Sequence, residues 1–133
     1  MLVVGCGNDE HRVPVACLEG NLQKALASAP GEVRIEGTRP SECFTRAANP
    51  AEIQQVGAVF IATAEKLADT ARSKPGSQAT LQLGYLIGAV RRGAGHTQGI
   101  HYETQRRIEQ ELNGVNTHTQ EFVLGERAGE KNG

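Results

Sequence analysis

The most regular hydrophobic pattern in the sequence lies between residues 49 and 73. Asn49 is a residue type that caps helix N-termini, Pro50 suits the first helical turn, and Glu52 can bond back toward the cap. The pattern therefore predicts a long bundle helix over about 49–73, which ends before Pro75. Its apolar positions recur at spacings of four and three residues: Ile53, Gly57, Phe60, Ala64, Leu67 and Ala71.

A second stretch, over about 77–92, is apolar on almost every side, which predicts the central and most buried helix of a bundle. Within it, Gly84 and Gly88 form a small-residue face that lets another helix approach closely. After a glycine-rich turn, a further stripe predicts a last helix over about 98–113, with Gly114 as its C-terminal cap. That stripe consists of Ile100, Thr104, Ile108 and Leu112.

The flanking segments have weaker patterns. Leucines at helical spacing predict an N-terminal helix over about 18–28, and alternating apolar and charged residues predict a short extended segment over 33–37. Residues 115–133 combine glycines with mixed charges and few apolar side chains, so we expect a loosely ordered tail. The sequence thus predicts a mostly α fold, a small bundle of three main helices within a single domain over 17–114.

Composition narrows the possible functions. The 133 residues include 15 acidic and 14 basic side chains, giving a net charge of −1, so a dominant nucleic-acid-binding surface is excluded. The chain contains no run of about 18 apolar residues, so no transmembrane helix is predicted. Leu, Ile, Val and Phe account for 29 of the 133 residues. That fraction is close to the roughly 20% below which chains tend to stay disordered, so we expect a thin core that needs further support.

The first residues resemble a processing site. Val3-Val4-Gly5-Cys6 is similar to the lipobox of bacterial lipoproteins, and a polar stretch follows it as a tether would. The resemblance to small exported bacterial lipoproteins of no assigned activity implies a lipid on Cys6 and a location in the cell envelope, on the outer face of a bacterial membrane. A signal segment needs a basic start and about 7–15 apolar residues, whereas only four residues precede Gly5. We therefore expect that translation starts upstream and that residues 1–16 are a signal remnant and tether.

Two alternatives remain for the same residues. Leu2-Val3-Val4 followed by Gly5-Cys6-Gly7 resembles the opening motif of Rossmann-like methyltransferases, which implies a cytosolic protein that binds a nucleotide-like cofactor in this loop. Against it, Pro14 interrupts the helix that should follow, and too few strand-like segments come after it to form a large parallel sheet. The other alternative is a plain cytosolic helical protein with a chance match at the start.

The expected state of Cys17 and Cys43 depends on which of these interpretations holds. If Cys6 carries lipid, these two cysteines are left as an even pair, which in an oxidising compartment predicts a disulfide. Closing that loop would stabilise the fold by roughly 3–4 kcal/mol. In a reducing cytosol both would be small buried side chains instead. Neither has a Cys or His partner at the short spacing of a metal site, so no metal is expected.

The remaining candidate chemistry gathers around the glycine-rich turn. Basic residues on both sides of the turn could form an anion-binding patch, and the alternative is a solvated face with arginines at a helix C-terminus. No catalytic motif, metal motif or cofactor is identified, so we expect a binding or structural role, with the partner and the oligomeric state left open. The candidate binding surface comprises Arg91, Arg92, His96, Thr97, Gln98, His101 and Arg107.

Overall fold

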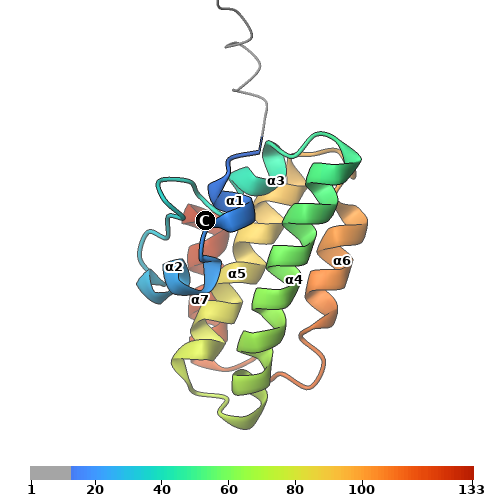
Figure 1. The fold of residues 1–133 in the computed structure, drawn as a ribbon. Helices are drawn as coiled ribbons and strands as arrows, with labels where there is room; N and C mark the ends of the chain where they lie inside the picture. Colours follow the sequence, from blue (N-terminus) through green and yellow to red (C-terminus); the bar gives the residue numbers. More distant parts are fainter. Residues whose placement is uncertain (1–12) are drawn as a thin grey trace, which may run out of the picture.

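The computed structural model describes residues 13–133, and these form a bundle of helices (Figure 1). The predicted mostly α fold is confirmed: the described residues contain no sheet, which is the element that a Rossmann-like cofactor site is built on. Cys6 and the Gly5-Cys6-Gly7 loop lie outside the described residues. The elements are α1 (Ala16–Glu19), α2 (Leu22–Ala25), the 3-10 turn η2 (Leu26–Ser28), α3 (Glu42–Thr45), α4 (Pro50–Ser73), α5 (Gln78–Gly95), α6 (Tyr102–Gln110) and α7 (Gln120–Asn132).

Helix α4 begins and ends where the sequence predicts. The side-chain oxygen of Asn49 accepts a hydrogen bond from the Glu52 amide at 2.9 Å, and the Glu52 carboxylate accepts one from the Ala48 amide at 3.1 Å. The first bond satisfies an amide that the first helical turn leaves free, and the second fixes the chain that enters the helix. The apolar stripe of α4, including Phe60 and Leu67, is buried against the rest of the bundle.

Helix α5 runs through the middle of the bundle, between α4 and α6 on one side and α7 on the other (Figure 1). All residues from Thr80 to Val90 are buried except Gln82, which is partly exposed. The prediction of a central buried helix is confirmed, although α5 continues three residues beyond the predicted end, to Gly95.

Helix α7 packs along α5 with the two backbones in direct contact. A Cβ added to Gly84 or Gly88 of α5 would lie 2.3 or 2.2 Å from a carbonyl oxygen of α7. A Cβ added to Gly125 or Gly129 of α7 would lie 2.0 or 2.2 Å from a carbonyl oxygen of α5. Such distances are far shorter than a van der Waals contact, so the crossing requires glycine at all four positions. The prediction that Gly84 and Gly88 admit a close helix is confirmed.

The prediction of a loosely ordered tail over 115–133 is wrong for the residues that form α7. Thr119 caps this helix by accepting a hydrogen bond from the Phe122 amide at 3.1 Å, and Phe122 is 2% exposed. The glycines of α7 lower its intrinsic helix propensity, but their four-residue spacing places them on one face against α5. Packing against α5 therefore stabilises a helix that the local sequence does not favour.

Helix α6 is shorter than the predicted 98–113 and is not one of the main packed helices, a role that α7 takes. Gln98 and Gly99 have φ values of 55° and 91°, which interrupt the helical conformation before Tyr102. Ile108 is the buried apolar residue of α6, whereas Ile100, which the predicted stripe includes, is 57% exposed.

The N-terminal part differs from the single helix predicted over 18–28. Gly20 separates α1 from α2, since its backbone is extended with a ψ of 160°. A Cβ at this position would lie 2.4 Å from the Ala16 carbonyl oxygen and 2.6 Å from the Ile35 side chain, so the close packing here requires glycine. The predicted extended segment over 33–37 is a tight turn, in which Ile35 and Thr38 exchange two backbone hydrogen bonds. Val13, which the sequence analysis assigned to a polar tether, is buried in the core.

A disulfide between Cys17 and Cys43 joins α1 to α3, as the sequence analysis expected for an oxidising compartment. Their Cα atoms are 5.6 Å apart, and both residues are almost completely buried. None of the helices in residues 13–133 combines the length and the apolar character that a membrane-spanning helix needs.

Candidate functional site

Arg91 occupies the centre of an ion-pair network that links three helices. From α5 it binds Glu109 of α6, with an N–O distance of 3.1 Å, and also Glu126 of α7. Gln105 donates a further hydrogen bond to the Glu109 carboxylate at 2.9 Å. Burial raises the pKa of Glu109, but the hydrogen bonds from Arg91 and Gln105 outweigh it, so this pKa lies below its ordinary value. Arg91 is thus committed to contacts within the fold.

The other two arginines of the predicted surface also have partners. Arg92 donates hydrogen bonds to the carbonyl oxygens of Glu130 and Lys131, at 3.1 and 2.8 Å, and so satisfies free carbonyls at the end of α7. Arg107 donates to Glu103, four residues earlier on the same helix, at 3.1 Å. Each of the three arginines therefore donates hydrogen bonds to a carboxylate or to backbone carbonyls within the fold.

The remaining residues of the predicted surface lie in the turn between α5 and α6, where some are exposed and others are at least partly buried. Thr97 donates a hydrogen bond to the Ala94 carbonyl oxygen at 2.6 Å, whereas His96 and Gln98 are exposed. His101 is fully buried, and its ring contacts Phe44 edge-on with centroids 5.3 Å apart. The structure therefore does not bring His96 and His101 together on one accessible surface.

The environment of His101 disfavours its charged form. Burial lowers the pKa of the imidazole, and the backbone carbonyls of Phe44 and Ala47 oppose this only in part. Neither ring nitrogen makes a hydrogen bond of good geometry. His101 is accordingly a core residue, and nothing in its surroundings makes it accessible to a ligand.

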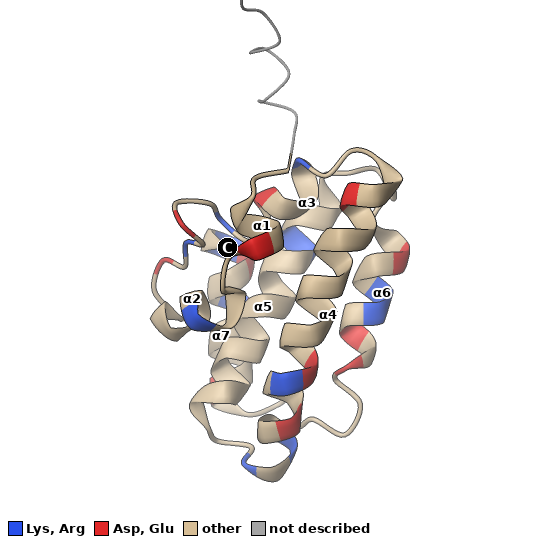
Figure 2. Ribbon diagram, viewed as in Figure 1, with Lys and Arg blue, Asp and Glu red and all other residues tan. Residues whose placement is uncertain are grey.

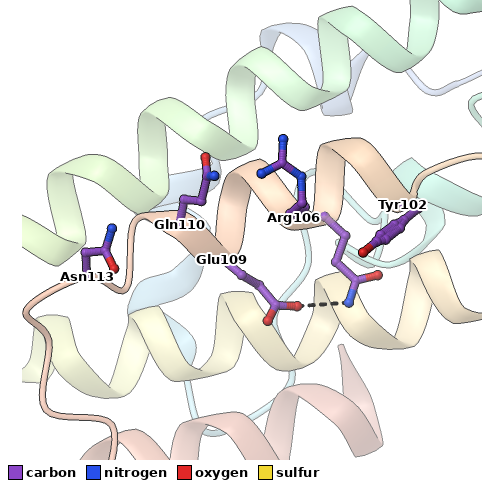
Figure 3. Close-up of a pocket in the computed structure, with 6 residues that line it drawn as sticks. Tyr102, Arg106, Glu109, Gln110 and Asn113 are labelled. Carbon is purple, nitrogen blue, oxygen red and sulfur yellow. Dashed lines mark hydrogen bonds between the residues drawn. The ribbon is translucent and has the colours of Figure 1, made fainter.

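The outer face of α6 carries a groove of about 440 Å³, here called the α6 groove (Figure 3). It runs between two rows of side chains that are each spaced by four residues, as ridges on a helix surface are. The first row is Tyr102, Arg106 and Gln110, and the second is Gln105, Glu109 and Asn113.

A second groove, of about 550 Å³, lies between α4 and α6. Apolar side chains form much of its walls, with Ile53 and Ile61 on the α4 side and the exposed Ile100 in the turn before α6. Gly57 lets α6 approach, since a Cβ at this position would lie 3.0 Å from the Thr104 methyl group. Residues of α6 line both grooves, so this helix is a candidate ligand-binding surface.

The α6 groove was not predicted from the sequence, which pointed to the adjacent turn instead. The only signal was a polar face on a short helix, and the same pattern is typical of a solvated surface. Basic and acidic residues are interspersed along the helices in the ribbon of Figure 2, which agrees with the net charge of −1. Within residues 13–133, no group of three or more His, Cys, Asp or Glu residues is arranged to hold a metal ion.

No protein-family model matches the sequence, and neither the curated proteins nor the solved structures contain a match to the chain.

Proposed function

We propose that this chain is the folded domain of an exported protein, located in the cell envelope, with a binding or structural role instead of a catalytic one. The observation that carries the proposal is the buried disulfide between Cys17 and Cys43. Disulfides of this structural kind persist in oxidising compartments and are rare in a reducing cytosol.

The disulfide supports the location through its place in the fold. It joins α1, which has only four residues, to α3, which is equally short. Helices of this length are not stable alone, so they depend on cross-links and tertiary packing. A domain with a small apolar core depends on the stability that a disulfide adds, and the disulfide persists only in an oxidising compartment.

A lipid on Cys6 would tether this domain to the outer face of a membrane. Cys6 lies outside the described residues, so this part of the proposal is supported by the resemblance of Val3-Val4-Gly5-Cys6 to a lipobox. The described fold begins at Val13, which leaves a short polar segment between the anchor and the first buried residue.

A count of free thiols tests the location. The full chain, with its upstream coding sequence, is isolated from its native host without reductant, denatured in guanidinium and titrated with a thiol reagent. We expect no more than one free thiol, none if Cys6 is acylated, and two additional thiols after reduction. Three free thiols before reduction would contradict the proposal.

The lipid anchor is tested separately. Metabolic labelling with a palmitate analogue should label the wild-type chain, and Cys6→Ser should abolish both the label and membrane association. The Cys17→Ala/Cys43→Ala double variant is the matched control, since it removes two cysteines and should keep the label. Label on the Cys6→Ser variant would show that the lipid is attached elsewhere.

A further inference from the structure

The α6 groove has the shape and lining of a shallow site for an extended ligand. Tyr102, at one end, is a large aromatic side chain that is 60% exposed. From there the two rows of side chains continue along the helix to Asn113 (Figure 3). At a rise of about 1.5 Å per residue, the helical part from Tyr102 to Gln110 spans about 12 Å, the scale of a short oligomer.

The charges of the groove are already neutralised by its surroundings. Arg106 donates hydrogen bonds to Glu103 at 3.2 and 2.6 Å, and Glu109 is bound by Arg91 and Gln105. A site for a phosphate or another anion needs cations that are free to form charge-assisted hydrogen bonds. The lining therefore favours an uncharged ligand.

What the groove offers instead is neutral hydrogen-bonding capacity beside an aromatic ring. The amides of Gln110 and Asn113 are exposed and form no side-chain hydrogen bond with other described residues. An amide side chain both donates and accepts hydrogen bonds, as a hydroxyl group does. The apolar C–H face of a sugar ring packs on an aromatic face, while its hydroxyls meet polar groups at the side.

The floor of the groove is held in place before a ligand arrives. Glu109 is fixed by Gln105 on its own helix and by Arg91 of α5, which is bound in turn to Glu126 of α7. Gln105 and Glu109 of the second row therefore keep their positions without a ligand, so the groove does not have to be formed on binding.

We propose that the α6 groove binds a neutral carbohydrate chain, with Tyr102 stacking on one sugar ring and Gln110 and Asn113 hydrogen bonding to hydroxyl groups. The choice of carbohydrate over other neutral polar ligands rests on the proposed function, because an exported domain meets the polysaccharides of the cell surface.

The test is an NMR titration of the ¹⁵N-labelled, disulfide-bonded chain with chitotriose and, separately, with cellotriose at millimolar concentration. We expect saturable shifts of the backbone amides of residues 102–113 with at least one of these probes. Tyr102→Ala should weaken binding by about two- to tenfold, the range that aromatic contacts give. The Gln110→Ala/Asn113→Ala double variant should also weaken it at an unchanged melting temperature, which provides a second measurement if Tyr102→Ala disturbs α6.

Matched controls lie on other helices. Leu124→Ala removes a large exposed apolar side chain from α7, and Gln55→Ala removes an exposed amide from α4. Both should leave the affinity unchanged. The proposal would be overturned by the absence of saturable shifts with both probes, by shifts confined to other helices, or by displacement of the sugar by inorganic phosphate. These outcomes are independent of the thiol count, so the failure of either proposal can be recognised alone.

Discussion

At the scale of single residues, two glycines of the same helix can have very different surroundings. A Cβ at Gly88 would lie 2.2 Å from the Glu126 carbonyl oxygen, whereas a Cβ at Gly95, in the last turn of the same helix, would meet nothing within 4 Å. The first glycine is required by packing, while the second only adds backbone freedom to the unfolded chain.

We therefore expect opposite effects of the same substitution at these two sites. Gly88→Ala should lower the free energy of unfolding by about 1–3 kcal/mol or more, because the backbones of α5 and α7 must separate. Gly95→Ala should leave it unchanged or raise it by up to about 1 kcal/mol. Urea denaturation of both variants measures the difference, and equal changes would show that α7 does not contact α5 as described.

His101 makes stability depend on pH. Its pKa in the folded chain is below the ordinary value of 6.5, so the unfolded chain takes up the proton first. The contribution of the neutral ring is complete above pH 6.5 and decreases as the pH falls, until the pKa of the folded state is reached. The loss should be at most about 1.4 kcal/mol per pH unit.

Urea denaturation at about pH 7.5 and about pH 5.5 measures this effect, in a window above the titration of most carboxylates. His101→Leu should show a smaller decrease in stability between the two pH values than the wild type. His96→Gln, in the same turn but exposed, should keep the wild-type decrease. A flat response of the wild type would contradict the burial of a neutral imidazole.

At the scale of helices, α7 provides the clearest test of the fold. Phe122 is 2% exposed and Leu124, two residues later, is 51% exposed. Phe122→Ala should cost about 3–5 kcal/mol, the range for a large buried side chain. Leu124→Ala should change stability by less than about 0.5 kcal/mol. In a loosely ordered tail both substitutions would be neutral, so thermal or urea unfolding of the pair discriminates between tail and helix.

The elements that the sequence predicts well are those where the apolar spacing and the end signals agree. Asn49 and Pro75 bracket α4, and a continuous apolar run identifies α5 as central. Helix α7 escapes prediction because its packing face is made of glycines, which carry no hydrophobic signal. Its stability comes from packing against α5, which ends 25 residues before α7 begins.

The candidate site was harder to predict than the fold. The basic residues near the turn are evident in the sequence, but the partners of Arg91 are 18 and 35 residues further along the chain. Which acidic side chains neutralise an arginine is decided by the packing of α6 and α7 against α5. The same holds for His101, whose burial against Phe44 depends on the position of α3.

At the scale of the whole molecule, the disulfide closes a loop of 26 residues and fastens the N-terminal segment to the bundle. Reduction should lower the free energy of unfolding by about 3–4 kcal/mol, through the entropy that the unfolded chain regains. Urea denaturation with and without a reductant measures this loss. The Cys17→Ala/Cys43→Ala variant should be insensitive to the reductant, and an equal response from it would attribute the effect to something other than this bond.

The contact between α5 and α7 also sets where the molecule can deform. Side chains that interdigitate can slip past one another by changing rotamers, but two backbones in contact at Gly84, Gly88, Gly125 and Gly129 have no rotamers to change. Helices α5 and α7 should therefore move as one stiff unit. Helix α6 instead packs through side chains, among them the buried Ile108 and the Glu109 carboxylate that Arg91 binds. Any relative movement of the helices within the bundle is therefore expected between α6 and the α5–α7 unit.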